Sequence, residues 1–72
     1  MPYLVLLFDS VNAALLAEKI LKEKGIPFKL IPVPKHISSD CGVCIRMGES
    51  ALQRALESLE GRVKVSATHT LP

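Results

Sequence analysis

Two cysteines, Cys41 and Cys44, stand close together in this chain and are its only thiols. Cys41 is flanked by Ser39, Asp40 and Gly42, residues that favour an exposed turn. Nearby positive charge stabilises the thiolate, which is the nucleophilic form of cysteine. Three basic residues lie near Cys41 in the sequence: Lys35, His36 and Arg46. The pattern indicates a reactive thiol at Cys41, although Asp40 opposes the cations and a small buried cysteine is the structural alternative.

Cys44 lies within the apolar segment that follows, and two interpretations are open for it. In a regular strand, residues 41 and 44 face opposite ways and lie about 10 Å apart, whereas a disulfide needs Cα atoms within about 7 Å. A bend at Gly42 would bring the thiols together. Cys44 is therefore either a plain sheet residue or a resolving thiol. His36, Cys41 and Cys44 supply at most three soft metal ligands where structural zinc takes four, so no metal or other cofactor is expected.

Composition limits the classes of function. The chain has 72 residues, 49% of them hydrophobic, and a formal net charge of +2, which fits a single domain over residues 1–72. With scattered charges, three aromatic residues and no tryptophan, nucleic-acid binding is not expected. The apolar run 3–8 is too short to span a membrane and lacks the basic n-region of a signal peptide. We expect a cytoplasmic protein.

The elements that must position the cysteines follow from the apolar patterning. The run Tyr3–Phe8 predicts a strand buried on both faces. A helical stripe follows, capped by Asp9-Ser10 and stopped by Gly25: Ala13, Leu16, Ala17, Ile20 and Leu21. Strands are predicted over 28–31 and 41–47, a second helix from about residue 49 to Gly61, and a last strand over 62–67 before a frayed tail, 68–72.

The predicted order β-α-β-β-α-β is typical of the ferredoxin-like α+β fold. Right-handed crossovers place both helices on one face of a four-stranded antiparallel sheet, with the first and third strands central. Because the first strand is apolar on both sides, the uncovered face is expected to expose apolar side chains. A partner, or a second copy in a homo-oligomer, would then cover it.

The long segment between the second and third strands resembles a known family, the Se/S carrier protein-like domains of bacteria. The resemblance extends over nearly the whole chain and is most specific in residues 31–46. The matching residues are Pro34, Lys35, Ile37, Ser38, Cys41, Gly42 and Arg46. The resemblance implies selenium or sulfur carriage with Cys41 as the atom-bearing residue, and partners similar to sulfurtransferases or cysteine desulfurases. Cys44 departs from the family pattern, in which a small apolar residue is usual at this position.

The leading hypothesis is a non-enzymatic carrier in which the Cys41 thiolate accepts the atom, with Lys35, His36, Ser38, Ser39, Gly42 and Arg46 as supporting residues. One alternative is a protein–protein interaction module that uses the open sheet face. The other is a CxxC protein that uses both thiols for disulfide exchange or metal binding.

Overall fold

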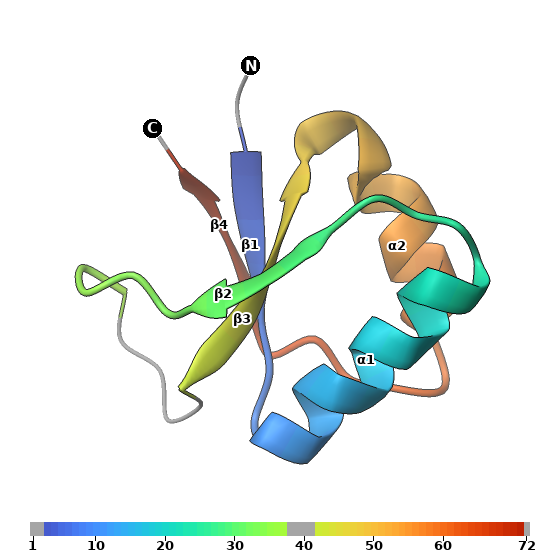
Figure 1. Cartoon of the computed structure of the whole chain (residues 1–72), viewed down its shortest axis with the longest axis horizontal. Helices are drawn as coiled ribbons and strands as arrows, with labels where there is room; N and C mark the ends of the chain where they lie inside the picture. The colour runs from blue at the N-terminus through green and yellow to red at the C-terminus, as the bar shows by residue number, and fades with distance from the viewer. Residues whose placement is uncertain (1–2, 38–41, 72) are drawn as a thin grey trace.

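The computed structural model describes residues 3–37 and 42–71. Within them the chain forms strand β1 (Tyr3–Leu7), helix α1 (Val11–Glu23), strands β2 (Lys29–Pro32) and β3 (Val43–Gly48), a 3-10 turn η1 (Glu49–Ala51), helix α2 (Leu52–Leu59) and strand β4 (Ala67–Leu71). Figure 1 shows the four strands on one side and the two helices beside them. The predicted β-α-β-β-α-β order and the α+β class are confirmed.

The four strands form one sheet in the order β2-β3-β1-β4, and each neighbouring pair is antiparallel. Strands β1 and β3 are central, as predicted, and β1 is buried from Leu4 to Leu7. Alternate residues of a strand point to opposite faces. Leu4 and Leu6 therefore face the helices, whereas Tyr3, Val5 and Leu7 face the other way.

Both ends of α1 have the features that the sequence predicts. The Ser10 side chain accepts a hydrogen bond from the Ala13 backbone at 3.1 Å, which caps the first turn. At the other end Gly25 has φ of 69°. The Ile26 amide donates to the Leu21 carbonyl at 3.0 Å, the bond typical of a Schellman motif, whose left-handed residue is most often glycine. The helix therefore stops where its hydrophobic face ends.

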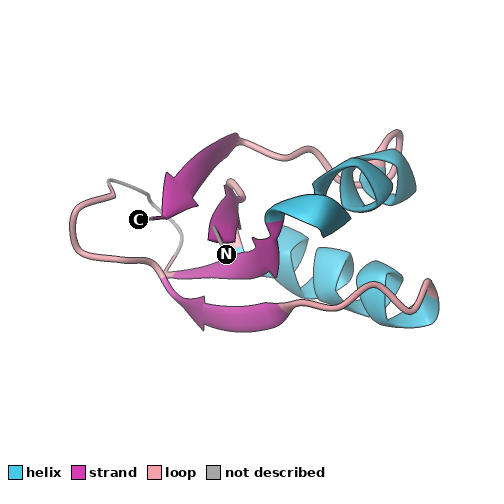
Figure 2. Ribbon diagram, turned by 90° about the horizontal axis from the view of Figure 1, so that it is seen from above, coloured by secondary structure: helices cyan, strands magenta, loops and turns pink. Residues whose placement is uncertain are grey.

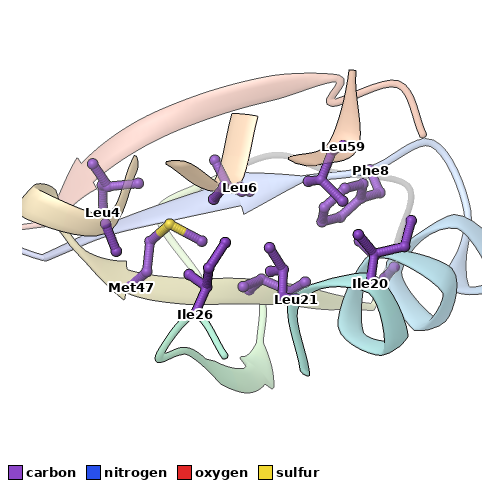
Figure 3. Close-up of a cluster of buried hydrophobic side chains, with 13 residues drawn as sticks. Leu4, Leu6, Phe8, Ile20, Leu21, Ile26, Met47 and Leu59 are labelled. Atoms are coloured by element: carbon purple, nitrogen blue, oxygen red, sulfur yellow. The ribbon is translucent and has the colours of Figure 1, made fainter. Parts of the chain in front are cut away.

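The main core lies between the helices and one face of the sheet. Figure 3 shows side chains from β1, α1, β3 and α2 converging there. Its buried members include Leu4, Leu6 and Phe8 from the first strand and its end, and Ile20 and Leu21 from α1. Both helices contribute to this one cluster, so both cover the same face, as predicted. Figure 2 shows the helices on one side of the strands.

The buried stripe of α1 differs from the predicted one at Leu16. The helix buries Ala14, Ala17, Ile20 and Leu21, whereas Leu16 is 43% exposed. The small side chains of Ala14 and Ala17 face the core, and Leu16 is left at its margin. Periodicity predicted the helix and most of its buried side, since Ala17, Ile20 and Leu21 are buried, and packing decided that Ala14 rather than Leu16 completes it.

The last strand lies five residues later than predicted. Residues 62–66 instead return the chain from α2 to the sheet, and Ala67–Leu71, predicted to be mostly a frayed tail, pairs with β1 from Leu7↔Ala67 to Tyr3↔Leu71. Val63 and Val65 pack on the helix side, whereas Ala67 packs on the opposite side. The alternation of Val63, Val65 and Ala67 along the sequence resembles that of a strand. In the structure, Val63 and Val65 belong to a loop that runs along the core. The ends of β2 and β3 also shift, from 28–31 to Lys29–Pro32 and from 41–47 to Val43–Gly48.

The prediction of an exposed apolar sheet face is wrong for Val5 and Leu7. Both are buried, in a second cluster with Ile37 and Cys44. Ile37 lies in the connection between β2 and β3, which turns back over the sheet. The chain thus covers part of this face itself, and Tyr3 is the member of β1 that stays exposed, at 45%. Neither helix of the described chain has the length and apolar character needed to cross a membrane.

Candidate functional site

The connection between β2 and β3 carries most of the residues predicted to act. Backbone hydrogen bonds hold its described part in place: the Val33 amide donates to the Gly42 carbonyl at 3.2 Å, and the Ile37 amide donates to the Pro34 carbonyl at 3.0 Å. The second bond closes a turn with Lys35 and His36 at its centre. Both side chains are exposed, so their positive or titratable groups face solvent.

Ile37 packs this connection against the sheet. Its side chain is only 7% exposed and lies in the cluster with Val5, Leu7 and Cys44. Four further hydrophobic residues pack against that cluster: Ile31, Val33, Ala67 and Leu71. Burying a side chain of this size stabilises the fold by about 1.5–3 kcal/mol, so the turn of Lys35 and His36 is held against the sheet by apolar contact.

Cys44 is fully buried beneath this connection, with an exposed fraction of 0%. It pairs with Ile31 across β2 and β3, and its Sγ donates to the Pro32 carbonyl at 4.0 Å. A buried thiol in apolar surroundings is inert because donors cannot reach it and the thiolate is poorly solvated. A partner protein could therefore reach Cys44 only if the sheet or the connection opened.

Arg46 lies two residues further along β3 and on the same face as Cys44. Its guanidinium carbon stands 4.7 Å from the centroid of the Tyr3 ring, within the range of a cation–π interaction. Gly42 is exposed and immediately precedes β3. The predicted residues Ser38, Ser39, Asp40 and Cys41 lie outside the described residues.

The structure therefore brings some of the predicted residues to one side of the sheet. Cys44 and Arg46 share the face that the connection covers, and Lys35 and His36 sit on that connection. Among residues 3–37 and 42–71, no group of three or more His, Cys, Asp or Glu side chains is arranged to hold a metal ion.

A comparison with protein-family models matches residues 3–70 to the family described as "Putative Se/S carrier protein-like". That is nearly the whole chain, and it includes the connection and all four strands. The chain belongs to this family. No curated protein and no solved structure matched it.

In this Se/S carrier-like domain, sequence reasoning overlooked two roles. The sequence prediction includes Ile37 only as part of the family pattern, and the signal for its burial is an apolar residue type, one of those most often buried, among Lys35, His36 and the serines. It places Tyr3 in the first strand with no part in the site. Its contact with Arg46 depends on the alignment of β1 with β3, Val5 opposite Arg46, which a single sequence does not reveal.

Proposed function

We propose that this domain is a cytoplasmic carrier of sulfur or selenium, and that the Cys41 thiolate bears the atom as a persulfide or selenosulfide. Membership of the Se/S carrier-like family supports the class of function. The observation that carries the assignment to Cys41 is the complete burial of Cys44. The chain has two cysteines, and a carrier thiol must meet its donor, so the proposal rests on the other one.

The proposed step needs no oxidant. The Cys41 thiolate attacks the outer sulfur of a donor persulfide, the donor's S–S bond breaks, and the donor leaves as a thiolate. A new S–S bond on Cys41 then holds the sulfane sulfur, and the same step in reverse order passes it to an acceptor. The selenium case is identical, with selenium as the outer atom. The partners we propose are donors and acceptors of the cysteine desulfurase or sulfurtransferase kind.

Positive charge near the thiol favours both the thiolate and the persulfide anion. Lys35 and His36 lie exposed in the same connection as Cys41, and Arg46 lies on the same sheet face. These side chains are the supporting residues of the proposal. Ser38 and Ser39, next to Cys41 in the sequence, are proposed as local hydrogen-bond donors.

The test is intact-mass measurement after incubation with a cysteine desulfurase and cysteine. The wild-type protein should gain the mass of one sulfur atom, and a thiol reductant should remove it. Cys41→Ser should gain nothing, whereas Cys44→Ala, the matched control, should load like the wild type. Loading of Cys41→Ser but not of Cys44→Ala would reverse the assignment.

The same samples separate the carrier from a CxxC redox protein. Mild oxidation of a redox pair would remove two thiols and two hydrogens from one molecule without adding an atom. If the wild-type protein formed that disulfide and never gained sulfur from any persulfide donor, the carrier proposal would fail.

A further inference from the structure

The sheet face opposite the helices carries a row of paired residues that includes two cations and a histidine. Lys29 on β2 is the partner of Arg46 on β3, Arg46 is the partner of Val5 on β1, and Val5 is the partner of His69 on β4. Directly paired residues of an antiparallel sheet point to the same face, and Val5 belongs to the cluster on this side. Lys29 and His69 are exposed and Arg46 is half-buried. The row therefore crosses all four strands at one level.

The connection adds to this charge. Lys35 and His36 are exposed on the turn that Ile37 holds against the same face. No acidic residue occurs in the described strands or in residues 33–37. The acidic residues of the described chain lie on the helices or beside them: Asp9, Glu18, Glu23, Glu49, Glu57 and Glu60. Among the described residues, the helix side mixes both signs, whereas the charged side chains of the strands and of residues 33–37 are all cationic: Lys29, Lys35 and Arg46.

This arrangement is unfavourable for the domain alone. Lys29 and Arg46 are directly opposite each other on β2 and β3, and like charges in that position destabilise a sheet. A glutamate at either position would form a favourable pair instead. The placement of like charges on this face therefore lowers the stability of the isolated domain. Such a placement is expected of a surface that binds a negatively charged partner.

Tyr3 gives the same face an apolar contact. Its ring is 45% exposed and supports the Arg46 guanidinium at 4.7 Å. Tyrosine and arginine are enriched among the residues that contribute most to binding at protein interfaces. The stacking also holds Arg46 in place before a partner arrives, so less side-chain freedom is lost on binding.

We propose that this face, formed by Lys29, Arg46, His69 and Tyr3 with the turn of Lys35 and His36, is the docking surface for an acidic surface on the protein that exchanges the atom with this domain. The inference rests on the proposed carrier function, because it names the partner of the same site. Gly42 immediately precedes β3, and from Gly42 to Arg46 the chain covers about 13 Å. An interface of standard size buries about 800 Å² on each partner, so one interface can include both this row and Gly42, the residue that follows Cys41 in the sequence.

The first test compares two charge reversals that leave the same net charge. Lys29→Glu reverses a charge on the docking face, and Lys19→Glu reverses one at an exposed position of α1, the helix that packs on the opposite face of the sheet. Transfer of sulfur from a persulfidated cysteine desulfurase is followed by intact mass at low ionic strength. Lys29→Glu should be slower by about tenfold or more, and Lys19→Glu by less than about twofold. In about 0.5 M salt the difference should disappear, because exposed charges are then screened.

A urea titration of Lys29→Glu accompanies that experiment. Its midpoint should lie at or above that of the wild type, because glutamate opposite Arg46 replaces a repulsion with an attraction. Slower transfer by a protein that is at least as stable cannot come from unfolding. Equal slowing by Lys19→Glu, or no effect of salt, would overturn the docking proposal.

The second test does not depend on atom transfer. A polyglutamate peptide is added to the isotope-labelled wild-type protein, and backbone amide shifts are recorded. The shifts should concentrate on β1, β2, β3, β4 and residues 33–37 and spare α1. A single-stranded oligonucleotide is the comparison, and exclusive binding of that probe on the face would replace a protein partner with a nucleic acid. Shifts spread evenly over the helices would also refute the proposal.

The two proposals fail separately. Glutathione persulfide, a small donor without a protein surface, is offered to the wild-type protein. If it transfers no sulfur and the desulfurase transfers none either, the carrier function fails, and the peptide titration still decides whether the face binds acidic protein. If sulfur is transferred but both charge reversals behave alike, the carrier function stands and the docking surface is wrong.

Discussion

Ile37 holds the connection between β2 and β3 against the sheet face opposite the helices. The substitution Ile37→Ala tests this anchoring role directly. The side chain is 7% exposed and contacts the cluster of Val5, Leu7 and Cys44. The substitution removes three buried carbons at about 0.8 kcal/mol each. Because Ile37 lies near the surface, the connection can move into the space that the side chain leaves, which limits the free-energy cost of a cavity. We expect the free energy of unfolding to fall by about 2–3 kcal/mol.

The same change should expose Cys44. Its thiol becomes accessible when the connection leaves the sheet, and a loss of about 2 kcal/mol in the anchoring contact favours that opening by about 30-fold. The assay is the alkylation rate of Cys44 in a Cys41→Ser background, where it is the only remaining thiol. A urea titration of the same protein measures stability.

Leu16→Ala is the control, because it truncates an aliphatic side chain that is 43% exposed. It should leave both the alkylation rate and the midpoint nearly unchanged. If Ile37→Ala shifted the free energy of unfolding by less than about 0.5 kcal/mol, the range of ordinary surface changes, and Cys44 stayed protected, then Ile37 does not anchor the connection and the explanation of the covered face is wrong.

Three further outcomes are expected. Cys44→Ser should lower the free energy of unfolding by about 1–2 kcal/mol, because a hydroxyl costs more to bury than a thiol; an increase in the urea midpoint would contradict this. Leu21→Ala should lower the free energy of unfolding by about 2–5 kcal/mol and Leu16→Ala by less than about 0.5 kcal/mol; equal urea midpoints for the two variants would show that the buried side of α1 is assigned wrongly. Gly25→Ala should cost about 1 kcal/mol because φ is 69° there, whereas Gly48→Ala, at φ of −71°, should be neutral or stabilising by calorimetry; the reverse order would refute the conformational argument.

Local signals in the sequence were sufficient for most of the fold. The apolar run from Tyr3, the Ser10 cap and the glycine at position 25 define the first strand and helix through interactions within a few residues. The last strand was misplaced for the opposite reason. Ala67–Leu71 is set by pairing with β1, from Leu7↔Ala67 to Tyr3↔Leu71, whose paired residues are 60 to 68 positions apart in the chain, and its residues ATHTL carry little apolar alternation.

Some features of the candidate site could likewise be predicted from the sequence, and others could not. Residue types alone indicated the thiols, the cations around them and the likeness to Se/S carriers, which the family match over residues 3–70 supports. The burial of each cysteine could not be predicted from its residue type, because a free cysteine is often a small core residue but is also the residue of exposed reactive thiols. The protected position of Cys44 follows from its pairing with Ile31 and from the cover that Ile37 provides.

The sequence by itself determined the order of the elements, the antiparallel α+β architecture and the two cysteines as the chemical feature, since periodicity, caps and turn residues act locally. The tertiary structure alone decided that the chain covers its own second face, that Cys44 is enclosed, and that Lys29, Arg46 and His69 align in one row. The physical reason is register: residues far apart in the chain become neighbours only when the strands pair, and a shift of one residue would send every one of these side chains to the other face.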